Sequence, residues 1–210
     1  MSTILTVIVV LGTIIVSMVL HELAHGYMAY LLGDMTAKED GRLTLNPAAH
    51  LDPMLSVVLP ILSFFMGGVV FGGAKPVPVN FSRLKGGVWG MALVALVGPL
   101  MNFVLAFIAY ALVMKVPVLQ EGIAGLILVR FAAVNLGFGV FNLIPIPPLD
   151  GSRILYALMP DFVREAMDKM EKVGIVLVYI LIVLGGGVFT VVMREAILGT
   201  TQLFDWILGL

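Results

Sequence analysis

The strongest constraint on this chain is a set of long apolar segments that carry almost no charge. Residues 3–20 contain no charged side chain, and about 18 such residues are enough to cross the hydrocarbon core of a bilayer. Runs of this length exceed the strands of a membrane β-barrel, so they predict helices. We expect an all-α polytopic membrane protein, a helical bundle of about four to six membrane segments. The clearest predicted spans are residues 3–31, 89–114, 123–143 and 173–193.

The composition supports this class and excludes others. Of the 210 residues, 60% are hydrophobic and 12% are charged, whereas a soluble domain carries about 25% charged residues. The formal net charge of −1 offers no basic surface, so we expect the lipid bilayer and not nucleic acid as the environment. The chain has no cysteine, so any metal must be held by histidine or carboxylate side chains.

Short stretches with a different pattern separate the spans. Residues 34–52 and 74–87 are polar, and the alternation of side chains within them predicts short β-strands near the active site. Residues 160–172 predict an amphipathic surface helix. The apolar stretch 196–210 is too short to be assigned as a span. Because no repeat or separate soluble domain is visible, we expect residues 1–210 to form a single membrane domain.

The first apolar run ends in His21-Glu22-Leu23-Ala24-His25. Ionisable groups at membrane depth are costly and mark candidate functional sites. On a helix, His21 and His25 share one face because they are four residues apart. This H-E-x-x-H pattern supplies two nitrogen ligands for one zinc ion, with Glu22 as the general base. A polar patch that only joins helices is the alternative.

A catalytic zinc needs three protein ligands and one open position, and Asp150 is the best candidate for the third ligand. It follows Pro145, Pro147 and Pro148, which interrupt the preceding helix and favour an extended chain. Gly151 lets the backbone turn close to a neighbour. A loop or helix-cap role for Asp150 is the alternative.

The metal hypothesis also constrains the topology, because His21, His25 and Asp150 must then lie at the same depth. Two spans already separate the motifs, so residues 54–73 must return to their starting side as a re-entrant or paired segment. The positive-inside rule then makes the metal side cytoplasmic. Two basic residues flank the spans on the far side, Lys115 and Arg194, against nine on the metal side: Lys38, Arg42, Lys75, Arg83, Lys85, Arg153, Arg164, Lys169 and Lys172.

The histidine motif at residues 21–25 and the proline-rich motif that ends at Asp150 and Gly151 together resemble those of the site-2 protease family, the intramembrane zinc metalloproteases of peptidase family M50. Residues 21–25 match the signature H-E-x-x-H, and residues 142–151 match N-x-x-P-x-P-x-x-D-G. Residues 98–102 resemble the G-P-x-x-N element of an intervening helix. The stretches 41–47 and 74–80 are similar to a compact prokaryotic subgroup that lacks PDZ and CBS domains.

The resemblance implies a zinc-dependent intramembrane endopeptidase of a prokaryotic plasma membrane, which cleaves transmembrane or signal-like protein segments with a metal-activated water. It implies one Zn²⁺ per chain, and transmembrane proteins or peptides as substrates. Asn102 and Asn142 are candidate donors to the substrate carbonyl or the intermediate, although membrane asparagines also join helices. An edge strand at 74–80 is the candidate surface for pairing with an unwound substrate.

A membrane metal transporter that uses the same His/Asp set as a transit site is the alternative function. A transporter predicts ligands on several spans and inverted repeats, and neither pattern is visible in the sequence. A helix-borne H-E-x-x-H suits fixed catalysis better.

Overall fold

The computed structural model describes residues 3–58, 73, 75–120 and 122–210. Helices and loops, without any β-strand, make up this part of the chain, which confirms the all-α class. The candidate membrane spans found in it are Ile8–Leu31, Val88–Lys115, Gly122–Asn142 and Gly174–Leu208.

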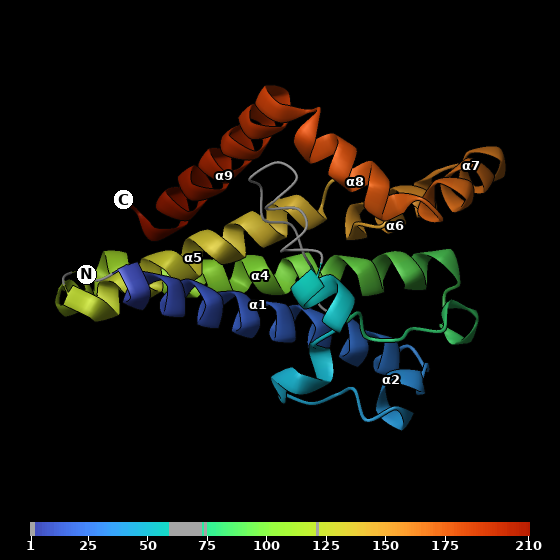
Figure 1. The fold of residues 1–210 in the computed structure, drawn as a ribbon, viewed down its shortest axis with the longest axis horizontal. Helices are drawn as coiled ribbons and strands as arrows, with labels where there is room; N and C mark the ends of the chain where they lie inside the picture. Colours follow the sequence, from blue (N-terminus) through green and yellow to red (C-terminus); the bar gives the residue numbers. More distant parts are fainter. Residues whose placement is uncertain (1–2, 59–72, 74, 121) are drawn as a thin grey trace.

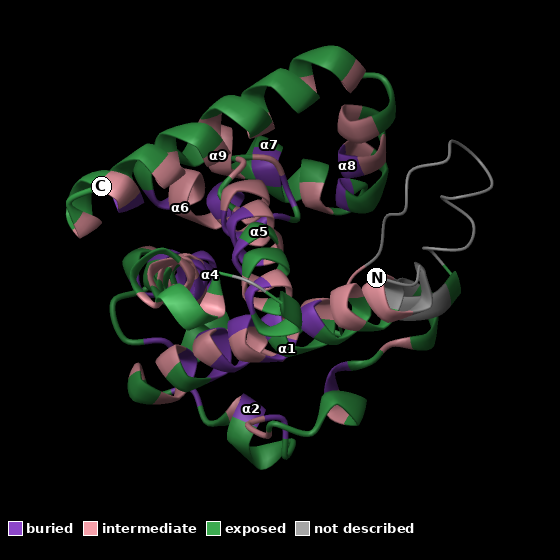
Figure 2. Ribbon diagram, turned by 90° about the vertical axis from the view of Figure 1, so that its left-hand side faces the viewer, coloured by how far each residue is buried: buried purple, intermediate pink, exposed green. Residues whose placement is uncertain are grey.

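Three long helices lie side by side and form the centre of the molecule (Figure 1). They are α1 (Thr3–Leu31), α4 (Val88–Lys115) and α5 (Gly122–Asn142). Buried alanine and glycine residues occur along their contacts, as expected where helices approach closely in lipid. Figure 2 shows the buried residues gathered on these helices, whereas α9 (Gly186–Leu208) is mostly exposed.

The last apolar region forms two helices that meet at an angle (Figure 1). The break lies at the glycine run, where Gly186 adopts a φ of 25° that favours glycine, so α8 (Gly174–Val183) ends before α9 begins. The predicted C-terminal end of the span 173–193 is therefore wrong, because α9 continues through residue 196 to Leu208. Hydropathy alone does not locate a bend inside a continuous apolar run.

The predicted β-strands in 34–52 and 74–87 are wrong for the residues described there. The first stretch contains α2 (Thr36–Glu39) and a 3₁₀ turn at Pro47–His50, and the second contains a 3₁₀ turn at Phe81–Arg83. Residues 75–80 form no regular secondary structure, and their backbone is bound by the side chains of Arg42 and Glu22 and by the His50 carbonyl rather than by a neighbouring strand. Within 54–73, helical turns cover Pro53–Val58 and only residue 73 follows, so the re-entrant prediction falls mainly outside the described residues.

Two short helices follow the proline-rich turn after α5. They are α6 (Asp150–Leu158), which the sequence did not predict, and α7 (Asp161–Glu171), which occupies the predicted surface helix 160–172. An ion pair between Arg153 and Glu171 joins them. A 3₁₀ turn at Pro117–Leu119 connects the C-terminal end of α4 to the start of α5.

Candidate metal centre

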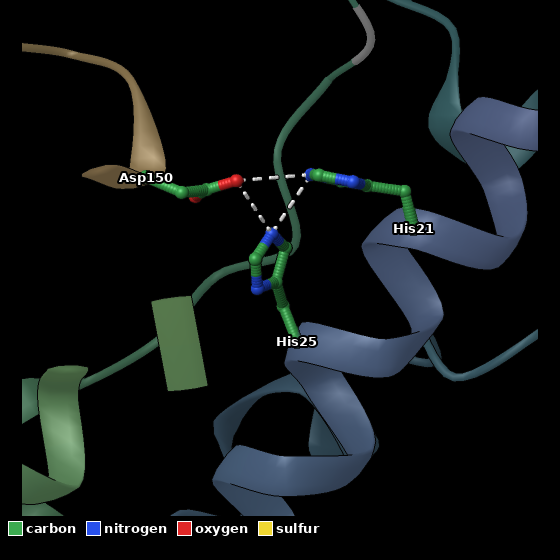
Figure 3. A group of neighbouring side chains, drawn as sticks. All are labelled: His21, His25 and Asp150. Carbon is green, nitrogen blue, oxygen red and sulfur yellow. Dashed lines mark hydrogen bonds and ion pairs between the residues drawn. The ribbon is translucent and has the colours of Figure 1, made fainter. Parts of the chain in front are cut away.

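Three side chains from distant parts of the sequence point toward one another (Figure 3). His21 and His25 project from α1, and their Nε2 atoms lie 2.9 Å apart. Asp150, in the first turn of α6, places Oδ2 3.2 Å from Nε2 of His21 and 3.4 Å from Nε2 of His25. The structure thus brings together the three predicted ligands in a group that could hold a metal ion.

The second nitrogen of each imidazole is held by an oxygen acceptor. His21 donates from Nδ1 to Asn102 Oδ1 at 2.6 Å, and His25 donates from Nδ1 to the Val94 carbonyl at 2.7 Å. A carbonyl only accepts, so a neutral imidazole in this position carries its proton on Nδ1 and leaves a lone pair on Nε2.

The donor set fits a divalent cation. Two lone pairs and a carboxylate oxygen face one another, and buried Asp150 Oδ2 has no hydrogen-bond partner among the described residues. Without a cation these electron-rich atoms repel one another. Ligands about 2.0–2.1 Å from a tetrahedral zinc lie about 3.3–3.4 Å apart. The separations of 3.2 and 3.4 Å between Asp150 and the imidazoles are close to this value, whereas the two Nε2 atoms, 2.9 Å apart, lie closer together.

Two glycines make the close approach of these helices possible. A Cβ on Gly98 of α4 would lie 2.3 Å from His25 Nε2 and 2.8 Å from His21 Cε1. A Cβ on Gly151 would lie 2.1 Å from the Leu143 carbonyl oxygen, so glycine lets α6 begin against the end of α5. The first glycine makes room for the imidazoles and the second places Asp150 beside them.

The predicted donor Asn102 is fully buried, with both ends of its amide engaged. Its Oδ1 accepts from His21, and its Nδ2 donates to Asn135 Oδ1 at 2.9 Å. This geometry revises the predicted contact with substrate, because Asn102 orients a histidine instead. Asn142 differs, since it lines a cavity beside the metal centre and donates from Nδ2 to the Phe138 carbonyl at 3.1 Å.

The cavity has a volume of about 770 Å³ and lies between α1, α5, the residues Gly73 and Pro76, and α8–α9. His21, Glu22 and Asn142 are among its polar lining residues. Much of its wall is apolar and includes Met18, Phe138, Phe141, Val173, Ile175, Val176, Ile182 and Met193. A polar reacting group and a bulky apolar side chain can therefore be accommodated together.

The segment 75–80 holds the Glu22 carboxylate. Glu22 Oε2 accepts a hydrogen bond from the Val77 backbone N–H at 2.8 Å. The start of the segment is bound by buried Arg42, which donates from Nη2 to the carbonyls of Lys75 and Pro76 at 2.9 and 3.3 Å. Glu22 is thereby fixed between its own helix and a restrained loop.

Asp34 restrains the other end of this segment. Its buried carboxylate accepts from the Asn80 N–H at 2.6 Å and from the Thr36 hydroxyl at 2.5 Å. Burial by itself raises the pKa of Asp34, but these hydrogen bonds, the Thr36 N–H and the charge of Arg83 hold its pKa below the ordinary value. Asp34 therefore stays ionised and keeps Asn80 in place.

Comparison with known proteins agrees with this centre. The model of peptidase family M50 matches residues 117–185, which contain Asp150. "Putative zinc metalloprotease YwhC" of Bacillus subtilis is 40% identical over 182 residues, covering 81% of this chain and 78% of that protein. The chain belongs to peptidase family M50. The predicted family resemblance is thus confirmed.

Other M50 relatives are more distant. Rip2 of Mycolicibacterium smegmatis, which carries the same description as YwhC, is 32% identical over 84% of this chain and 67% of its own length. Rip2 of Mycobacterium tuberculosis strain H37Rv is 32% identical over 83% of this chain and 66% of its own length. No solved structure matches.

Two residues of this M50 centre were missed by reasoning from sequence. Asn135 and Ser17 are fully buried and hydrogen-bonded to each other, and Asn135 also binds Asn102. The available signal was an asparagine inside a largely apolar span. The sequence did not indicate the hydrogen-bond partners of this asparagine, because they lie on other helices.

Proposed function

We propose that this protein is a zinc-dependent intramembrane endopeptidase that cleaves transmembrane or signal-like segments of membrane proteins. The supporting observation is that His21, His25 and Asp150 converge beside a cavity that also includes Glu22. The two histidines lie on a helix apolar enough to span a membrane, so the proposed chemistry takes place within the lipid layer.

Nε2 of His21, Nε2 of His25 and Oδ2 of Asp150 are the atoms that would hold one Zn²⁺, leaving one position open for water or substrate. Zinc bound there would polarise a peptide carbonyl and would lower the pKa of a water toward about 7.

We assign proton transfer to Glu22. Its Oε2 is oriented by the Val77 N–H, and Oε1 is the atom proposed to take a proton from the attacking water. The hydroxyl part of the water adds to the carbonyl carbon. Glu22 then gives its proton to the amide nitrogen as the C–N bond breaks, which produces one carboxyl and one amino end.

Asn142 is the proposed donor to the substrate carbonyl. It lines the cavity, and one N–H of its amide binds Phe138 while the amide has a second N–H to donate. A donor of this kind is worth about 2.7–4 kcal/mol of barrier.

The proposed substrate is an unwound, apolar peptide. Carbonyls of a transmembrane helix are bonded within the helix, so the helix must open before a water can attack. Segment 75–80 lies next to Glu22, to which the Val77 N–H donates, and is the proposed surface for the opened peptide. The apolar cavity wall suits hydrophobic side chains on either side of the cleaved bond.

The proposed orientation places the metal centre near the cytoplasmic surface of a prokaryotic plasma membrane. Basic residues support it, because they gather on α2 after α1, on the loop before α4, and on α6 and α7 after α5.

The test is cleavage of a single-span substrate in proteoliposomes by the native protein and by Glu22→Gln. We expect the variant to keep its zinc and to lose cleavage, because an amide cannot accept the proton. Unchanged cleavage by Glu22→Gln contradicts this mechanism. Zinc flux into the vesicles without cleavage favours the transporter.

A further inference from the structure

Three buried hydrogen bonds link Ser17 to His21 by way of α5 and α4, and the turn of α1 between these two residues closes them into a ring. Asn135 of α5 donates from Nδ2 to Ser17 Oγ at 2.8 Å, and Asn102 of α4 donates from Nδ2 to Asn135 Oδ1 at 2.9 Å. His21, one helical turn after Ser17, donates from Nδ1 to Asn102 Oδ1 at 2.6 Å. Ser17, Asn102 and Asn135 are each 0% exposed.

The direction of every bond in this ring follows from one backbone carbonyl. Asn135 Nδ2 also lies 2.9 Å from the Phe131 carbonyl oxygen, which can only accept, so the amide nitrogen must face that side. Oδ1 of Asn135 then faces Asn102, which must donate its own Nδ2. Asn102 consequently turns Oδ1 to His21, which must donate from Nδ1.

We propose that Asn135 is a positioning residue that sets the tautomer of His21 through Asn102. It touches neither the metal ligands nor the cavity lining described for the site. Its effect is to keep the His21 proton on Nδ1 and the lone pair on Nε2, the atom that faces His25 and Asp150. The proposal rests on the proposed function, because it assumes that these atoms bind zinc.

Removing Asn135 would take away the only feature of the ring that distinguishes the two ends of the Asn102 amide. Asn102 could then rotate and present Nδ2 to His21. The imidazole would have to accept at Nδ1 and carry its proton on Nε2, where it cannot bind a metal. Partners that orient a ligating histidine typically change metal affinity by about 10–100-fold.

The first experiment measures the zinc Kd of the purified full chain by chelator competition. We expect Asn135→Leu to raise the Kd about tenfold, the lower end of that range, because it acts through another residue. Thr13→Val is the matched control, since Thr13 is buried on α1 one turn before Ser17 and belongs to none of the bonds of the ring. Thermal unfolding and helix content establish that each variant is folded.

A double mutant tests the route. If Asn135 acts through Asn102, adding Asn135→Leu to Asn102→Leu raises the Kd no further than Asn102→Leu alone. The proposal is overturned if the double mutant raises the Kd by the product of the two single-mutant factors. It is also overturned if folded Asn135→Leu has an unchanged Kd.

Nitrogen-15 NMR of the histidine rings in the metal-free native protein needs no variant at all. We expect His21 to carry its proton on Nδ1, and a dominant Nε2–H form overturns the proposal. These readouts separate the two proposals. A native protein that binds no zinc refutes the proposed function, whereas zinc binding and cleavage with an indifferent Asn135 refute only the positioning role.

Discussion

A single methyl group on Gly98 should disable the metal centre. Gly98 lies on α4 where that helix faces the two imidazoles of α1. Its alanine Cβ would lie 2.3 Å from Nε2 and 2.4 Å from Cε1 of His25, and 2.8 Å from Cε1 of His21. Gly98→Ala therefore tests whether this close approach is needed for metal binding.

The size of the effect follows from these distances. Ordinary contact of a Cβ begins near 3.4 Å, so the His25 ring or its helix must move by about 1 Å. The His25 imidazole is also held by its hydrogen bond to the Val94 carbonyl, which like Gly98 belongs to α4, so the imidazole cannot move freely. Metal-ligand distances tolerate about 0.2 Å. We expect zinc affinity to fall by at least about 100-fold, with an overpacking cost of about 1–3 kcal/mol.

The assay is chelator competition for zinc, together with thermal unfolding in the same detergent. Gly12→Ala is the matched control, because Gly12 lies within α1 and a Cβ there meets nothing within 4 Å. The control should bind zinc like the native protein. Native zinc affinity in folded Gly98→Ala would refute the inference that this glycine makes room for the ligands.

Two further predictions concern the loop and the cavity. Asp34 has a lowered pKa in the folded state, so its ionised form stabilises the fold above the unfolded pKa of about 3.9, and this contribution is lost as the pH falls through the lower folded value. The difference in unfolding temperature between native protein and Asp34→Asn should therefore be largest near neutral pH and shrink below about pH 4; a pH-independent difference would contradict this. Asn142→Ala should lower kcat about 100–1000-fold and leave the zinc Kd unchanged, and a change in KM alone would argue against contact with the transition state.

The wrong predictions share a physical cause. Alternating side chains at 74–80 predicted a strand, but a strand needs a neighbour for its backbone, and in this protein Glu22, Arg42 and Asp34 bind that backbone instead. The role of Asn102 was revised for a similar reason. Its amide is engaged by groups on two other helices, and no local pattern names them.

The sequence by itself determined the membrane class, the helix that carries His21 and His25, and Asp150 as their partner. Long apolar runs and i, i+4 spacing are local properties that can be read without knowing what lies nearby. Only the tertiary structure decided the bend before α9, the space made by Gly98 and the ring through Asn135. Those features depend on which helices pack together, and packing joins residues far apart in the chain.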